Sequence, residues 1–208
     1  MQDGLLPLFP LQVVLLPGSQ LPLHIFEDRY KEMIGEVLRD KIEFGVVLAS
    51  EKGIVNTGCT AVVDRVLKEY PDGRLDILTR GRRRFEVLLL NDERSFLRGA
   101  VEFFDDDDPD PSAPADPDLL RNVIAFSQLP LDPESSDSRL SFRLAQDVSD
   151  LGFRQTLLTM RSEADRMRRI ADYLPGYLQR KKRVQHTKNV AGQNGHGHKP
   201  PESSQDPS

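Results

Sequence analysis

Short apolar runs separated by turn-forming residues fill the first half of the chain, as expected for a set of strands. One run ends at Pro17-Gly18, and the turn Pro71-Asp72-Gly73 separates two others. This second turn predicts a hairpin, because proline presets φ and glycine accepts a positive φ. The expected strands are residues 8–15, 44–49, 60–67, 75–79, 85–89 and 96–104. About six short strands indicate a small, partly closed barrel.

One amphipathic helix interrupts these strands. Apolar residues recur at helical spacing after Asp28, which is a suitable N-cap. The stripe consists of Tyr30, Met33, Ile34, Val37 and Leu38. Residues at these spacings share one face of a helix, so this helix is expected to cover a core.

The pattern changes at residues 105–118, where seven of fourteen residues are aspartates and four are prolines. Repulsion between like charges and the missing N–H of proline predict an exposed linker. The aspartates lack the alternate ligand spacing and the central glycine of a calcium loop, so no metal site is expected here.

Helical periodicity returns after the linker. The expected helices are residues 117–130, 138–152, 153–160 and 162–174, and Pro175-Gly176 is expected to end the last one. Ser162 with Asp165 three residues later resembles a capping box. These helices predict a small helical subdomain over residues 119–179. Residues 180–208 are basic and polar, with little apolar surface to offset the entropy of ordering, and predict a disordered tail.

Composition narrows the possible partners. The net charge of the 208 residues is −5, so no overall field attracts the chain to nucleic acid or to an anionic membrane. Cys59 is the only cysteine, which excludes an internal disulfide and a cysteine-rich zinc site. The apolar runs fall short of the about 20 residues that a membrane helix needs, and no basic segment of a secretory signal precedes them. We therefore expect a cytoplasmic protein with no membrane partner.

Motifs for catalysis are missing from the sequence. It contains no glycine-rich loop ending in Gly-Lys-Ser or Gly-Lys-Thr and no Gly-x-Ser-x-Gly elbow. No spacing brings Cys59 and His24 together, and a lone cysteine or histidine is more often a packing residue than part of a dyad. The histidines near the end of the chain lack the rigid set of ligands of a structural zinc site. We expect no enzyme activity and no cofactor.

An apolar segment before the helix is the first candidate binding site. Residues 21–26 place several apolar groups in a short irregular run, more than one face can bury. The candidate protein-binding residues are Leu21, Leu23, His24, Phe26 and Tyr30. An exposed apolar patch often marks an interaction site. The alternative is that all of these residues lie under the amphipathic helix.

A basic cluster, formed by Arg82, Arg83 and Arg84, is the second candidate. Nucleic-acid binding would use such side chains to neutralise phosphates. The negative net charge, the absence of tryptophan and an aromatic content of 7% argue against it, because stacking platforms are scarce. We favour the alternative in which these charges protect a strand edge from unwanted pairing.

The segment LPLFPL, followed by LPG and LPLHIFEDRY, resembles the opening of the amino-terminal, substrate-binding domain of ATP-dependent Lon proteases. The resemblance continues to residue 104 and, more weakly, through the helices to residue 174. It implies an α+β fold: a small PUA-like pseudo β-barrel over residues 1–104, followed by a small helical bundle. It also implies a free-standing binding domain, because the ATPase and the serine-lysine peptidase of Lon have no counterpart in the sequence.

In Lon proteases this domain helps to capture unfolded or tagged proteins. The resemblance therefore implies a non-catalytic protein-binding module whose partner is an unfolded or a specific protein. The alternative is an RNA-binding protein that uses Arg82, Arg83 and Arg84, since PUA-type folds elsewhere bind RNA.

Overall fold

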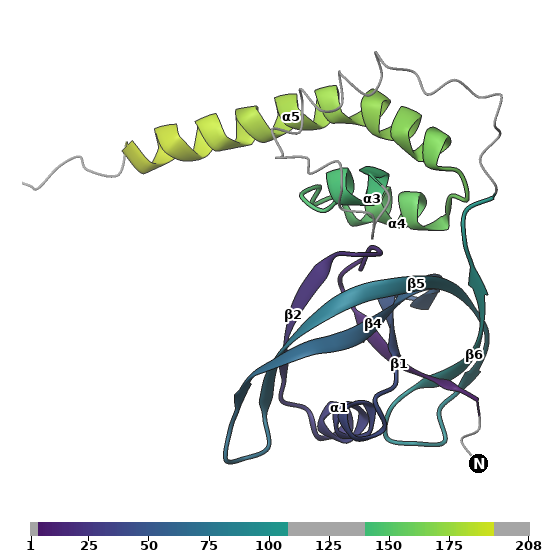
Figure 1. Cartoon of the computed structure of the whole chain (residues 1–208). Coiled ribbons are helices and arrows are strands. Elements are labelled where there is room, and N and C mark those ends of the chain that lie inside the picture. Colours follow the sequence, from purple (N-terminus) through teal and green to yellow (C-terminus); the bar gives the residue numbers. More distant parts are fainter. Residues whose placement is uncertain (1–3, 108–139, 194–208) are drawn as a thin grey trace, which may run out of the picture.

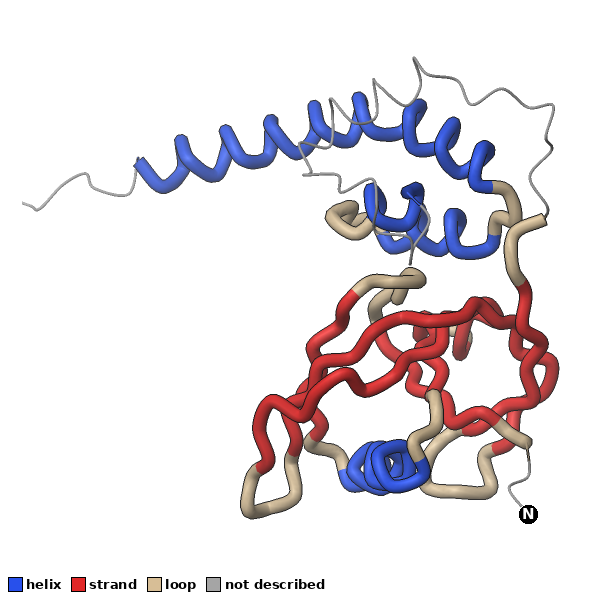
Figure 2. The backbone as a smooth tube through the Cα atoms, in the orientation of Figure 1, coloured by secondary structure: helices blue, strands red, loops and turns tan. Residues whose placement is uncertain are grey.

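The computed structural model describes residues 4–107 and 140–193 (Figure 1). Six strands of the first range form one mixed sheet, and helices make up the second range (Figure 2). This arrangement confirms the predicted α+β class. The elements are β1 (Leu6–Leu11), β2 (Gln20–Ile25), α1 (Asp28–Asp40), β3 (Phe44–Ser50), β4 (Gly53–Glu69), β5 (Leu75–Asn91), β6 (Arg98–Phe104), α3 (Leu140–Ala145), α4 (Leu151–Thr159) and α5 (Glu163–Gln193).

The sheet closes on itself because β5 pairs with different neighbours along its length. Its first half lies between β2 and β4, and its second half pairs with β6. The circuit is completed by β6 pairing with β1, β1 pairing with β3 in parallel, and β3 pairing with β4. The predicted strands 75–79 and 85–89 are thus one strand, since the arginine-rich stretch between them keeps its ladder with β4.

The helix α1 lies at one end of the barrel (Figure 1), with most of its predicted apolar stripe buried. Leu38 is the exception, at 36% exposed. The predicted N-cap is also wrong: Glu27 takes that position, and Asp28 is the first helical residue. The Asp28 carboxylate instead accepts a hydrogen bond from Lys31 Nζ at 3.1 Å. The buried residues of the stripe are Tyr30, Met33, Ile34 and Val37.

The helices α3, α4 and α5 lie at the opposite end of the barrel (Figure 1). Gly152 does not stop a helix as predicted but lies inside α4. The signal that decides this boundary is Asp150, whose side chain accepts a hydrogen bond from the Phe153 N–H at 2.9 Å and caps the helix. Ser162 caps α5 as predicted, since its hydroxyl accepts a hydrogen bond from the Asp165 N–H. One hydrophobic cluster runs from α1 through the barrel into these helices, so the described parts share a core.

The helix α5 continues to Gln193 instead of ending at Pro175-Gly176. Pro175 removes one backbone hydrogen bond from α5, but its φ fits a helix. The glutamine, arginine and lysine residues that follow it are good helix formers, so the helix continues. The predicted disorder of the tail is therefore wrong for residues 180–193. The predicted helix over 117–130 and residues 194–208 lie outside the described residues.

The predicted exposed linker is described only at residues 105–107, and one residue there contradicts the prediction. The Asp106 side chain is 2% exposed and lies between two arginines. The charges of the two arginines offset the cost of burying the Asp106 carboxylate. A run of consecutive aspartates in the sequence does not indicate that one of them has such partners.

Candidate functional site

A pocket of about 190 Å³ lies between the end of β1, the end of β2 and the start of α1. Four of the five predicted protein-binding residues line it: Leu23, His24, Phe26 and Tyr30. Leu21 does not line the pocket. It lies opposite Thr79 of β5, whose hydroxyl donates a hydrogen bond to the Leu21 carbonyl at 2.8 Å.

The floor of the pocket is aromatic and apolar. The rings of Phe9 and Tyr30 pack with centroids 4.1 Å apart, and both side chains are buried. Burial raises the pKa of the Tyr30 hydroxyl; the nearby Arg29 guanidinium opposes this shift. Tyr30 therefore stays neutral near pH 7, and the Arg29 guanidinium lies over its ring, 4.5 Å from the centroid.

The remaining lining, here called the rim, includes Phe26 and His24 and the ion pair of Glu27 with Arg29. Phe26 is 58% exposed, and its ring stacks on the His24 imidazole with centroids 5.8 Å apart. His24 is held in place by Asp76, which also accepts a hydrogen bond from the Tyr70 hydroxyl at 2.8 Å. The hydrogen bond with His24, followed by that from Tyr70, lowers the pKa of the Asp76 carboxyl. These contacts fix the position of the His24 ring, while the Phe26 ring beside it remains exposed to solvent.

The predicted candidates for chemistry lie apart from one another. Cys59 does not line the pocket; it is fully buried, and burial raises the pKa of its thiol to about 12, so no thiolate forms near neutral pH. Within residues 4–107 and 140–193, no group of three His, Cys, Asp or Glu side chains could hold a metal ion. No helix of the described part combines the length and the apolar character that a membrane span requires.

The predicted basic cluster is not one surface patch. Arg84 points inward and is 4% exposed, whereas Arg82 and Arg83 are exposed. The guanidinium of Arg83 is engaged with Glu43 at 3.2 Å and lies over the Phe103 ring. The ladder between β4 and β5 shifts register between Gly81 and Arg84, so these side chains do not follow a simple alternation. The expected role of the arginines as protection of a sheet edge is untenable for Arg84, which lies in the core.

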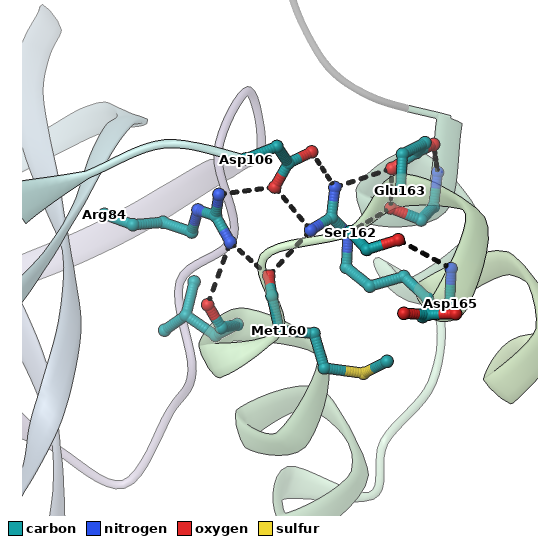
Figure 3. A network of polar contacts seen from close by, with 9 residues as sticks. Arg84, Asp106, Met160, Ser162, Glu163 and Asp165 are labelled. Carbon is teal, nitrogen blue, oxygen red and sulfur yellow. Dashed lines mark hydrogen bonds and ion pairs between the residues drawn. The ribbon is translucent and has the colours of Figure 1, made fainter. Parts of the chain in front are cut away.

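Arg84 instead belongs to a buried polar network between the barrel and the helices. Figure 3 shows Arg84 beside Asp106 and the Met160 carbonyl. Arg166 also contacts the Asp106 carboxylate, and the Met160 carbonyl accepts hydrogen bonds from both guanidinium groups. Asp106 lies 2.6 Å from each of Arg84 Nη2 and Arg166 Nη1. Glu163 accepts a further hydrogen bond from Arg166. This network joins β5, the chain after β6 and α5, and sequence analysis did not predict it.

Comparisons with known proteins agree with the fold and the resemblance. The family model of the ATP-dependent protease La (LON) substrate-binding domain matches residues 5–191. The chain belongs to this family. The Lon protease of Parabacteroides distasonis is 33% identical over 114 residues, which cover 50% of this chain and 14% of that protease. Lon protease 1 of Hydrogenovibrio crunogenus is 31% identical over 104 residues, covering 46% of this chain and 13% of that protease.

Solved structures of Lon amino-terminal domains match over more of the chain. The Lon N-terminal domain protein from Xanthomonas campestris has a TM-score of 0.68 and 27% identity, and the match covers 82% of this chain and 99% of that chain. The N-terminal domain of the Mycobacterium avium complex Lon protease has a TM-score of 0.59 and 16% identity over 82% of this chain and 98% of that chain. At that identity it supports the fold alone. Thus the match covers nearly all of these domains but only a small part of the full proteases.

Proposed function

We propose that the chain is a non-catalytic protein-binding module, which takes up apolar side chains of unfolded or partner proteins in the pocket beside Phe26. The observation that carries the proposal is that the exposed Phe26 lines the same pocket as the buried Phe9–Tyr30 pair. The family description, substrate-binding domain, supports protein as the ligand. Proteolysis or protein quality control in the cytoplasm is the setting that we propose for it.

The size of the pocket favours a polypeptide side chain over a small molecule. Its volume of about 190 Å³ is below the roughly 300–1,000 Å³ typical of small-molecule sites. An incoming apolar side chain would cover part of the exposed Phe26 ring, at a gain of about 25 cal/mol for each Å² of apolar surface removed from water. A single pocket of this kind supports weak, broadly selective binding, as suits unfolded segments.

An aggregation assay with a denatured model protein tests this proposal. The intact chain should slow the aggregation of the denatured protein, and Phe26→Ala should abolish most of this effect, because the truncation removes the apolar rim. Since Phe26 is 58% exposed, the variant should keep its fold. Leu38→Ala, at a partly exposed leucine of α1 that does not line the pocket, is the matched control and should behave like the unmodified chain. Equal protection by all three proteins would refute the role of the pocket.

RNA binding is the second candidate, and it has less support because Arg84 is buried and Arg83 is paired. If RNA were the ligand, the logarithm of the affinity would fall linearly with the logarithm of the salt concentration. We expect a gel-shift titration at low salt to show no complex.

A further inference from the structure

Three consecutive leucines on β5 are exposed to solvent. The exposed fractions of Leu88, Leu89 and Leu90 are 64%, 66% and 47%. Single exposed apolar residues are common on protein surfaces, but a run of three is unusual unless another molecule covers it. None of the three leucines lines the pocket beside Phe26.

The leucines lie where β5 has a partner strand on one side only. Pairing between β5 and β4 ends at Thr57↔Glu86, whereas pairing between β5 and β6 continues to Asn91↔Arg98. A register shift between Val87 and Leu89 marks a bulge at the start of this stretch. In the described chain, the other edge of β5 beyond Glu86 therefore has no partner strand and can pair with an added one.

The charges around this edge are mostly acidic. Glu86 and Glu102 lie opposite each other on β5 and β6, and Asp92 and Glu93 follow the leucines. Glu93 lies 4.0 Å from Arg98 of β6, and the adjacent Arg94 is paired with Glu32 and Glu36 of α1. An acidic rim repels phosphate groups and favours lysine or arginine side chains on the partner.

The same charges disfavour a second copy of this chain as the partner. If two copies paired antiparallel about Leu89, then Glu86 of one copy would lie opposite Asp92 of the other. Like charges directly opposite each other across two strands are destabilising. A partner strand with an apolar centre and basic ends would instead place lysine or arginine side chains opposite Glu86 and Asp92.

We propose that the free edge of β5 from Val87 to Asn91 binds an extended protein segment with an apolar centre flanked by lysine or arginine. The segment adds a strand to the sheet: backbone hydrogen bonds provide affinity, and the leucines together with the acidic rim provide selectivity. This surface is separate from the pocket beside Phe26, so either can exist without the other.

A labelled peptide of about nine residues tests the proposal on the full chain. The peptide has alternating valine and threonine in its centre and lysine pairs at both ends, and its binding is followed by fluorescence anisotropy. Leu89→Lys should weaken binding by about tenfold or more, since it places a charge on the apolar edge and repels the basic ends. Leu67→Lys, at a leucine that is 54% exposed on β4, is the matched control and should leave the affinity unchanged.

Two altered peptides separate strand addition from general adhesion. Methylation of alternate backbone nitrogens in the centre should abolish binding, because it removes ladder donors, and replacement of the lysines by glutamates should weaken it. Equal affinity of Leu89→Lys and the unmodified chain, or unchanged binding of the methylated peptide, would overturn the proposal. So would a concentration-dependent dimer of the free chain in sedimentation that Leu89→Lys abolishes, because the edge would then be occupied by a second copy. Phe26→Ala should leave binding of this peptide intact, which separates this test from that of the pocket.

Discussion

Asp106 lies in a run of aspartates that look alike in the sequence, yet its environment differs from that of its neighbours. Asp105 and Asp107 are exposed, whereas the Asp106 carboxylate is enclosed by the guanidinium groups of Arg84 and Arg166. A buried ion pair contributes little compared with an apolar replacement, but the loss of one partner leaves an uncompensated buried charge. The network should therefore be sensitive to neutralisation of this single residue.

Asp106→Asn should lower the free energy of unfolding by about 3 kcal/mol, because two buried guanidinium groups lose their shared anion. Urea denaturation followed by circular dichroism measures this change. Asp107→Asn is the matched control and should have an effect within about 0.5 kcal/mol, since its side chain is exposed. Similar stabilities of the two variants would show that the buried network does not hold the helices on the barrel.

The residues that could be predicted from the sequence are those whose role depends on near neighbours. Residues 21–26 combine more apolar groups than one face can bury, and the pocket is lined by Leu23, His24 and Phe26 of this run. Arg84 was assigned to a surface cluster because its immediate neighbours are arginines. Its partners Asp106 and Arg166 are 22 and 82 positions away along the chain (from the residue numbers). No local pattern connects such distant residues, so this part of the fold required the structure.

At the scale of elements, helix and strand lengths were harder to predict than their existence. The period of the α1 stripe and the turn at Pro71-Asp72-Gly73 identified a helix and a hairpin, and Gly73 has the expected positive φ of 81°. The breakers Gly152 and Pro175, by contrast, lie inside α4 and α5. A glycine or a proline inside a helix costs about 1 or about 3 kcal/mol. Capping by Asp150 can offset the cost of Gly152 in α4, and the helix-forming residues around Pro175 can offset its cost in α5.

Pro175→Ala should raise the free energy of unfolding by about 2 kcal/mol, because alanine supplies the N–H that α5 lacks and removes the clash of the ring with the preceding turn. Thermal or urea unfolding measures the gain. Pro71→Ala is the control: this proline presets φ in the hairpin turn, so its removal should cost up to about 1 kcal/mol. No gain for Pro175→Ala would argue that α5 does not continue through this position as an intact helix.

At the scale of the molecule, the barrel and the helices share one hydrophobic core and one buried ion network. This framework holds the ends of β1 and β2 and the start of α1 in place, so that Phe26 and His24 line one pocket with the buried Phe9 and Tyr30. The free edge of β5 lies on another part of the same barrel. We propose that this body carries two separate surfaces for protein binding, the pocket beside Phe26 and the edge of β5.

The most direct test of the central claim is an NMR titration of the isotope-labelled chain with a permanently unfolded model protein. We predict that the backbone amides with the largest shift changes belong to the pocket, at residues 9, 11 and 23–30, and that Phe26→Ala strongly reduces these changes. Shift changes that leave out the pocket, or that persist unchanged in Phe26→Ala, would contradict the claim.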